Sequence, residues 1–440
     1  MNTVNKLLKA LGENTKLNKN TFSEYIAFHG IGEAYNKRWL GNIVPADLLK
    51  LSVKEAIEII STLSESGIFF EHFPTNILTP NYGDNWGRLA NYIEINNRAI
   101  AYMDNGCTCK GILSSIKLLP AIPPSAKSFA NCVILSQIWQ NIFGDAYEKG
   151  PIEENSIYGI RLNTSYSDNI IDYSIIDKIS AEEQLKAFVD LAHFRGLKVG
   201  FRHVISADQI KIASPDGDII FDWENPEHQE IYINECVKLV NLGFECMFID
   251  SAKHIGGYDM ENYTGVGALP EYEQMQYILH EIRSRTGKTN ISFVGEKSSD
   301  DYERYKFLGL NAGTDFINGD NFEAVRNLSE NLKYMREYAP GVEVTNDNFS
   351  GGLSYEQKLN RINSALFGYY LASDKLPSFM QMDDLFPLRY DTNTHHIMMT
   401  NPSYSTDGTA LSHWENLFTK DDGREYNKHV GELFAWAMNR

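Results

Sequence analysis

From about residue 98 the chain alternates between strand patterns and helix patterns, and this alternation constrains its fold more than any other feature. Eight short apolar runs have the length and composition of strands that are buried on both faces. Eight strand–helix pairs in order predict the α/β class, with a (β/α)8 TIM barrel as the architecture. A doubly wound open sheet is the alternative, but no glycine-rich phosphate turn follows any early strand. The predicted strands are Ala99–Met103, Cys132–Ile138, Lys198–Val204, Cys246–Asp250, Ile291–Gly295, Thr314–Ile317, Val342–Thr345 and Ser378–Met382.

Helical patterns lie between these strands, and two of them begin with a clear start signal. Ser180 precedes Ala-Glu-Glu, and Asn225 precedes a proline. Both arrangements are typical of helix N-termini. Ahead of the alternating region, a helix is predicted over Ser52–Gly67 and a strand over Ile68–Phe73. The helices predicted within the alternating region are Gly111–Leu119, Ala181–Arg195, Pro226–Leu242, Pro270–Arg285, Asp300–Leu308, Glu323–Tyr338, Tyr355–Ala372 and Val430–Met438.

The chain is therefore divided into two predicted parts. Residues 1–97 form an N-terminal extension or a small decorating domain, and residues 98–440 form the barrel. A length of 440 residues accommodates a barrel of at least about 250 residues together with such an addition.

Composition and charge exclude several classes of protein. A formal net charge of -18 argues against nucleic acid or an anionic membrane surface as the partner. No apolar run approaches the roughly 20 residues that a membrane-spanning helix needs. The N-terminal stretch Met1–Lys19 is polar and lacks the apolar core of a secretory signal, and the five cysteines have no disulfide spacing, so we expect a cytoplasmic protein. The sequence gives no indication of the oligomeric state.

Acidic residues follow three of the predicted strands. Asp250 ends the fourth strand, Glu296 follows the fifth, and Asp347 comes shortly after the seventh. In a parallel barrel the C-terminal ends of the strands meet at one rim, where catalytic groups lie. Retaining glycoside hydrolysis needs two carboxyl groups about 5–5.5 Å apart, and a third acid favours the cationic transition state. Taken singly, each acid is also consistent with solvated surface, and Asp250 with a cap of the following turn.

The stretch around the fourth strand resembles a known family motif. Gly243-Phe-x-x-x-x-Ile-Asp250-x-x-Lys253-His254 is similar to the fourth-strand motif of the α-amylase superfamily, the family 13 glycoside hydrolases. The resemblance implies that Asp250 is the nucleophile, and that Lys253 and His254 line the subsites for the outgoing sugar.

Further segments extend the resemblance over roughly residues 98–385. Phe-Val-Gly-Glu296 resembles the fifth-strand motif and implies that Glu296 is the general acid/base. Thr-Asn346-Asp347 resembles the seventh-strand motif, in which the Asp stabilises the transition state and Asn346 replaces a His. Ser-Ile-Tyr158-Gly resembles the segment whose Tyr stacks under the sugar, although a core Tyr fits equally well. The stretch Lys110–Pro120 resembles the first barrel helix of the maltosyltransferase branch.

The chain departs from the family at the third and fourth strands. Phe248 stands where the family has an Arg two residues before the nucleophile. On the third strand, Arg202 stands where the family has the Asp of Asp-x-x-x-Asn-His, and Ser206-Ala207 stands where it has the Asn-His pair. The Asn of that motif binds a structural calcium in many members, so we predict no calcium here. Strands three and four are neighbours, so we expect Arg202 to point at Asp250 and supply the missing guanidinium. The alternatives are that Arg202 faces a rim acid such as Asp208, and that a one-residue shift in register turns His203 into the cleft.

Other parts of the family pattern are missing. The resemblance implies a β-sandwich after the barrel and a large insertion after the third strand, and the sequence has room for neither, which favours a small or specialised substrate. The adjacent His395 and His396 have no metal-ligand spacing, so no metal and no cofactor are expected.

Two functions of different classes remain. The first is a retaining α-glycoside hydrolase or α-glycosyltransferase that acts on α-glucosidic oligosaccharides through a covalent glycosyl-Asp250 intermediate. The second is a catalytically impaired barrel that serves as a sugar-binding or scaffold protein, which the altered third strand favours and the three acids oppose.

Overall fold

The structure is a computed structural model of the chain. It describes residues 2–12, 51–65, 86–95, 112–122, 130–136, 138–140, 160–167, 170–250, 252–257, 269–295, 304, 307–318, 340–345 and 378–381.

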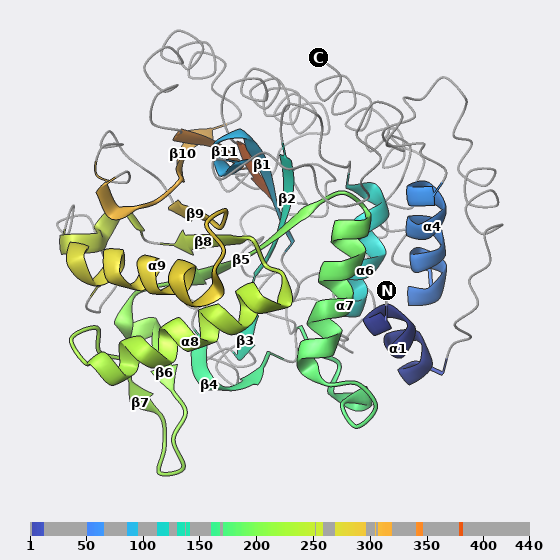
Figure 1. Cartoon of the computed structure of the whole chain (residues 1–440), viewed down its shortest axis with the longest axis horizontal. Helices are drawn as coiled ribbons and strands as arrows, with labels where there is room; N and C mark the ends of the chain where they lie inside the picture. Colours follow the sequence, from blue (N-terminus) through green and yellow to red (C-terminus); the bar gives the residue numbers. More distant parts are fainter. Residues whose placement is uncertain are drawn as a thin grey trace, which may run out of the picture.

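Eight parallel strands form a closed barrel in the order β1-β12-β11-β10-β9-β8-β5-β2 (Figure 1). Strand β1 pairs with both β2 and β12, so the hydrogen-bonded ladder closes on itself. The predicted α/β class is confirmed. The strands are β1 (Ala90–Ile95), β2 (Ala130–Leu135), β5 (Lys198–Val204), β8 (Cys246–Asp250), β9 (Ser292–Gly295), β10 (Ala312–Asn318), β11 (Pro340–Thr345) and β12 (Ser378–Gln381).

The first strand was predicted in the wrong place. The barrel begins with β1 at Ala90–Ile95, whereas the sequence pattern favoured Ala99–Met103, which lies outside the described residues. Strand β1 therefore lies within residues 1–97, the range assigned to an N-terminal extension, so that boundary was drawn too late. The physical reason is that β1 carries a charged residue, Glu94, which is 3% exposed. This buried acid interrupts the apolar run by which buried strands are recognised.

Helices lie on the outside of the barrel beside strands β2, β5, β8 and β9 (Figure 1). Both predicted start signals are confirmed: Ser180 forms a capping box with Glu183, and Asn225 accepts a hydrogen bond from the Glu227 backbone ahead of α8. The predicted helices from Glu323 onward lie outside the described residues. The α-helices are α1 (Asn2–Ala10), α4 (Val53–Glu65), α6 (Ile112–Leu118), α7 (Ala181–Phe194), α8 (Pro226–Leu242) and α9 (Tyr272–Thr286), and the short 3-10 helices are η1 (Trp86–Leu89), η2 (Leu119–Ala121), η5 (Tyr173–Ile175), η6 (Ala207–Gln209) and η7 (Ala252–Gly257).

A second, four-stranded sheet was not predicted. It has the order β3-β4-β6-β7 and consists of β3 (Trp139–Gln140), β4 (Ile160–Tyr166), β6 (Ile210–Ile212) and β7 (Ile219–Ile220). Strands β3 and β4 come from the connection after β2, and β6 and β7 from the short connection after β5. Strands β3, β6 and β7 have only two or three residues, which is too short to show an alternating pattern. Strand β4 has seven residues and was missed in the sequence analysis.

The apolar core has two layers, which the side-chain alternation of the strands separates. The outer layer lies between the barrel and its helices and is the larger one. The inner layer fills the barrel and consists of Trp86, Ala90, Tyr92, Ala130, Cys132, Ile134, Cys246, Phe248 and Val294. Where β5 meets β8, Gly200 makes room for this layer, because a Cβ atom there would lie 2.7 Å from the Cβ of Cys246.

Candidate active site

Asp250 is the last residue of β8, and its side chain belongs to the inner face of the barrel. Cys246 and Phe248 belong to the inner layer of the core, whereas Met247 and Ile249 belong to the outer layer. The same period of two places Asp250 on the inner face, at the C-terminal end of the strand. It is 6% exposed, so its carboxylate is largely removed from water.

Arg202 reaches this carboxylate from the neighbouring strand β5. Its Nε and Nη2 atoms both donate to Oδ2 of Asp250, at 3.1 and 3.0 Å. The predicted contact between these two residues is thus confirmed. The alternative partner, Asp208, instead accepts a hydrogen bond from the Ser206 hydroxyl. Two charge-assisted hydrogen bonds to one oxygen fix the orientation of the carboxylate.

Glu94 completes the cluster, and sequence reasoning missed it. The Nη1 atom of Arg202 donates to Oε2 of Glu94 at 3.0 Å. Because Glu94 is 3% exposed and Arg202 is 6% exposed, one guanidinium joins two buried carboxylates from β1 and β8. The only sequence signal was an acid within the short run Tyr-Ile-Glu94-Ile, and that acid obscured the strand.

Phe248 lies beside the same guanidinium. The centre of the Arg202 guanidinium is 5.0 Å from the centroid of the Phe248 ring, which is within the range of a cation–π contact. Phe248 therefore supports an arginine that comes from the neighbouring strand.

His203 does not lie on this face of the barrel, so its predicted role as a substrate-binding residue was wrong. Its ring packs in the outer layer near Trp139, Phe201 and Tyr232, and it forms a hydrogen bond with the Tyr232 hydroxyl. The reason is the strand alternation: since Arg202 points inward, the next residue points outward. Burial lowers the pKa of His203 to about 3, so its ring is neutral at neutral pH.

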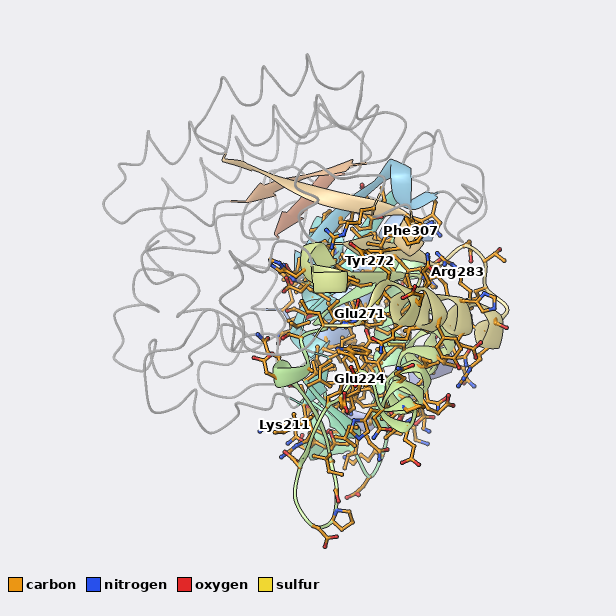
Figure 2. All side chains as sticks on the ribbon, turned by 90° about the vertical axis from the view of Figure 1, so that its left-hand side faces the viewer. Lys211, Glu224, Glu271, Tyr272, Arg283 and Phe307 are labelled. Atoms are coloured by element: carbon orange, nitrogen blue, oxygen red, sulfur yellow. The ribbon has the colours of Figure 1, made fainter. Side chains whose placement is uncertain are left out.

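The segment that follows β8 carries the predicted subsite residues Lys253 and His254. His254 lies in η7 and is 2% exposed; the Lys253 side chain is not among those described. This segment is held against α9, because Arg304 donates both to the Ile255 carbonyl and to the Tyr272 hydroxyl. Figure 2 shows Tyr272 beside Phe307, and their rings meet edge to face at 6.0 Å. The subsite roles of Lys253 and His254 stay predictions.

The other predicted site residues, Glu296, Asp347, Asn346 and Tyr158, lie outside the described residues. The strands that precede the acids are described. Strand β9 pairs in parallel with β8 and ends at Gly295, and β11 is parallel to them and ends at Thr345. Glu296 is therefore the next residue after an adjacent strand of the same barrel.

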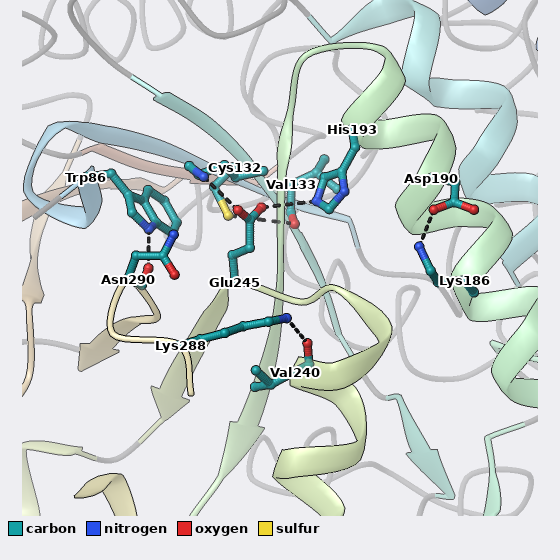
Figure 3. A network of polar contacts seen from close by, with 11 residues as sticks. Trp86, Cys132, Val133, Lys186, Asp190, His193, Val240, Glu245, Lys288 and Asn290 are labelled. Carbon is teal, nitrogen blue, oxygen red and sulfur yellow. Dashed lines mark hydrogen bonds and ion pairs between the residues drawn. The ribbon is translucent and has the colours of Figure 1, made fainter. Parts of the chain in front are cut away.

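A separate polar cluster occupies the opposite, N-terminal end of β8 (Figure 3). Glu245 accepts a hydrogen bond from Lys198 at 2.7 Å and lies 3.1 Å from the His193 Nε2 atom. The ammonium of Lys198 lies 4.8 Å from the Trp86 ring centroid. Burial alone would raise the pKa of Glu245, but the hydrogen bond with His193 and the charge of Lys198 outweigh it, so the pKa lies below its ordinary value. Lys198 thus neutralises the charge of Glu245 at the N-terminal end of the barrel strands.

Among the described residues, no group of three or more His, Cys, Asp or Glu side chains is arranged to hold a metal ion. His395 and His396 lie outside that part of the chain. No helix in the described ranges is long and apolar enough to cross a membrane.

The sequence matches no protein-family model and no curated protein. The fold is similar to that of solved enzymes. One is a pullulanase from Paenibacillus barengoltzii in complex with maltohexaose and α-cyclodextrin, at 11% identity and a TM-score of 0.47, with 82% of this chain and 64% of that chain covered. Another is a cyclic α-maltosyl-(1→6)-maltose hydrolase from Arthrobacter globiformis, at 10% identity and a TM-score of 0.48, with 80% and 83% covered. A third is an α-amylase from H. orenii, at 14% identity and a TM-score of 0.45, with 78% of this chain and 82% of that chain covered. This chain thus spans 64% of the length of the pullulanase. Likenesses with TM-scores below 0.5 support neither a family nor an activity.

Proposed function

We propose that this protein is a retaining α-glycoside hydrolase or α-glycosyltransferase that acts on α-glucosidic oligosaccharides. The observation that carries the proposal is the buried carboxylate of Asp250 at the C-terminal end of a barrel strand, held by the Arg202 guanidinium through two hydrogen bonds to one oxygen. An ionised, oriented carboxylate at that rim is what a covalent glycosyl intermediate requires.

In the proposed reaction Asp250 attacks the anomeric carbon of the bound sugar. The bond from that carbon to the leaving oxygen breaks, and the leaving oxygen takes a proton from Glu296. The resulting glycosyl ester is then resolved by water or by a sugar hydroxyl, whose proton returns to Glu296. Because Arg202 binds Oδ2, it fixes which oxygen of Asp250 faces the substrate.

The role of Glu296 is supported by the pattern of strand β9. Val294 belongs to the inner layer of the core, and Ser292 contacts the inner residue Tyr92. A period of two predicts the next inward position at residue 296, directly after the strand that pairs with β8. The assignment of Asp347 to transition-state stabilisation follows from the resemblance of its motif.

The remaining parts of the proposal rest on the resemblance and the sequence pattern. They comprise a complete (β/α)8 barrel, subsites that include Tyr158, Lys253, His254 and Asn346, and a small or specialised sugar as substrate. A cytoplasmic location, a need for neither metal nor cofactor, and kinship with the maltosyltransferase branch stay predictions of the same kind.

An activated donor tests the activity without knowledge of the natural acceptor. We expect the protein to release fluoride from α-glucosyl or α-maltosyl fluoride, and Asp250→Asn to release it at least about 1,000-fold more slowly. Glu230→Gln is the matched control, because Glu230 is a carboxylate that pairs with Arg285 on the outer helices. No release by a folded wild-type protein contradicts the proposal.

The second candidate is a sugar-binding barrel without catalysis. It is favoured by one observation: the third strand has Arg202 where the family has an acid, and the neighbouring His203 faces the outer layer. This candidate predicts that maltooligosaccharides bind, as measured by calorimetry, while fluoride release equals that of Asp250→Asn.

A further inference from the structure

We propose that Glu94 is a positioning residue that sets the orientation of Asp250 by holding Arg202. The inference rests on the proposed function, in which the Asp250 carboxylate is the nucleophile. It begins from the way in which the guanidinium is divided: Nε and Nη2 face Asp250, and Nη1 faces Glu94.

The topology shows why Arg202 needs a second anchor. It extends from β5, whereas Glu94 lies on β1, and the two strands are separated by β2 in the barrel. From β5, Arg202 therefore reaches across the inside of the barrel to Glu94 on β1 and to Asp250 on β8. A long side chain that reaches a carboxylate from a neighbouring strand has many rotamers, and one contact at its end does not select among them.

Together the contacts define both the position and the plane of the guanidinium. All three nitrogens donate a hydrogen bond to one of the two carboxylates, and the Phe248 ring centroid lies 5.0 Å from the centre of the guanidinium. Glu94 fixes the end of the fork that points away from Asp250. Loss of that contact removes one of the three hydrogen bonds that orient the fork, and with it part of the restraint on the Asp250 carboxylate.

The charges in the cluster make a distinctive prediction. Two carboxylates share one cation, and all three groups are at most 6% exposed. If Arg202 is removed, both carboxylates lose the guanidinium that they share, and their like charges repel each other more strongly in a region of low dielectric. Glu94 thus assists Asp250 while Arg202 is present and opposes it when Arg202 is absent.

This change of sign distinguishes positioning from simple support of the fold. A residue that only stabilises the barrel lowers activity in either background. A positioning residue that acts through Arg202 lowers activity in the wild type, but its neutralisation raises activity once Arg202 has been replaced.

The experiment measures the rate constant of fluoride release from α-glucosyl fluoride for the wild type, Glu94→Gln, Arg202→Met and the double variant. We expect Glu94→Gln to be slower by about tenfold and Arg202→Met by about 100-fold or more, since small misplacements of reacting groups cost factors of this size. The double variant should be faster than Arg202→Met. Glu94→Asp, which keeps the charge but withdraws it from Nη1, should also be slower than the wild type.

The matched control is Glu235→Gln. Like Glu94, Glu235 is a buried glutamate that pairs with a cation, but it lies on α8 and its partner is Lys238. It should release fluoride at the wild-type rate. The inference is overturned if Glu94→Gln reacts within twofold of the wild type, or if the double variant is no faster than Arg202→Met. A wild type that releases no fluoride contradicts the proposed function as well, so the two failures are distinguishable.

Discussion

At the scale of single residues, Asp250, Arg202 and Glu94 form one unit. Two hydrogen bonds of 3.0–3.1 Å join Arg202 to Asp250, and one of 3.0 Å joins it to Glu94. Burying charges is favourable only when they are paired and hydrogen-bonded, so such a unit is sensitive to the loss of any member.

Replacement of Arg202 tests its catalytic importance. Arg202→Met should lower kcat on an α-glycosyl fluoride by about 100- to 1,000-fold, because the carboxylate of Asp250 loses both of these hydrogen bonds. Arg202→Lys keeps the positive charge but lacks the planar guanidinium, so its kcat should lie between those of the wild type and Arg202→Met. Steady-state kinetics on folded protein measures both, and an unchanged kcat for Arg202→Met would show that the contact has no role in turnover.

His203 predicts a specific dependence of stability on pH. Burial holds its pKa at about 3, below the ordinary value near 6.5. The unfolded chain therefore binds a proton below about pH 6.5 while the folded protein does not. The contribution of neutral His203 to the free energy of unfolding is fully present above about pH 6.5. It is lost as the pH falls toward the folded pKa, at up to about 1.4 kcal/mol per pH unit.

The measurement is urea unfolding at pH 7 and pH 5. From the wild type we expect a loss of about 2 kcal/mol over this interval from His203, and His203→Gln should lack it. His228→Gln, a half-buried histidine on α8, should behave as the wild type does. An equal loss in all three proteins would contradict the assignment.

At the scale of secondary-structure elements, prediction succeeded where local sequence determines the outcome. The bounds of β5, β8 and α8 were predicted to the residue, because apolar runs and helix caps are read locally. Strand β1 was missed because its buried acid pairs with an arginine that lies 108 residues further along the chain. The same reason hid Glu94 from the site, since its partner is revealed only when the barrel closes.

The capping box of α7 gives a prediction at this scale. The Ser180 hydroxyl accepts from the Glu183 backbone, and the Glu183 side chain accepts from the Ser180 backbone. Ser180→Ala should lower the free energy of unfolding by about 1 kcal/mol. Ser284→Ala, an exposed serine within α9, should change it by less than about 0.5 kcal/mol. Thermal or urea unfolding makes the comparison, and equal effects would contradict it.

At the scale of the whole molecule, polar clusters occupy the two ends of β8 and an apolar layer lies between them. Asp250 belongs to the cluster at the C-terminal rim, and Glu245 to the one at the N-terminal floor (Figure 3). We expect the first to serve turnover and the second to serve stability, in keeping with the two ends of such barrels.

Replacement of Glu245 tests this division. Since its pKa is lowered in the folded protein, its contribution is present above the unfolded pKa of about 4.3 and is lost as the pH falls through the folded value. Glu245→Gln should lower stability at pH 7 by about 2 kcal/mol while leaving fluoride release per folded molecule unchanged. It should also remove this part of the acid dependence. A large loss of turnover in a folded variant would contradict the division.

The central claim is that Asp250 forms a covalent bond to the sugar. The most direct measurement is the mass of the protein after incubation with a 5-fluoro-α-glycosyl fluoride, a donor whose intermediate accumulates, followed by peptide mapping. We expect one added glycosyl group, which is carried by the peptide that contains Asp250 and is absent from Asp250→Asn. An adduct on another residue, or a folded wild-type protein that forms none, would contradict it.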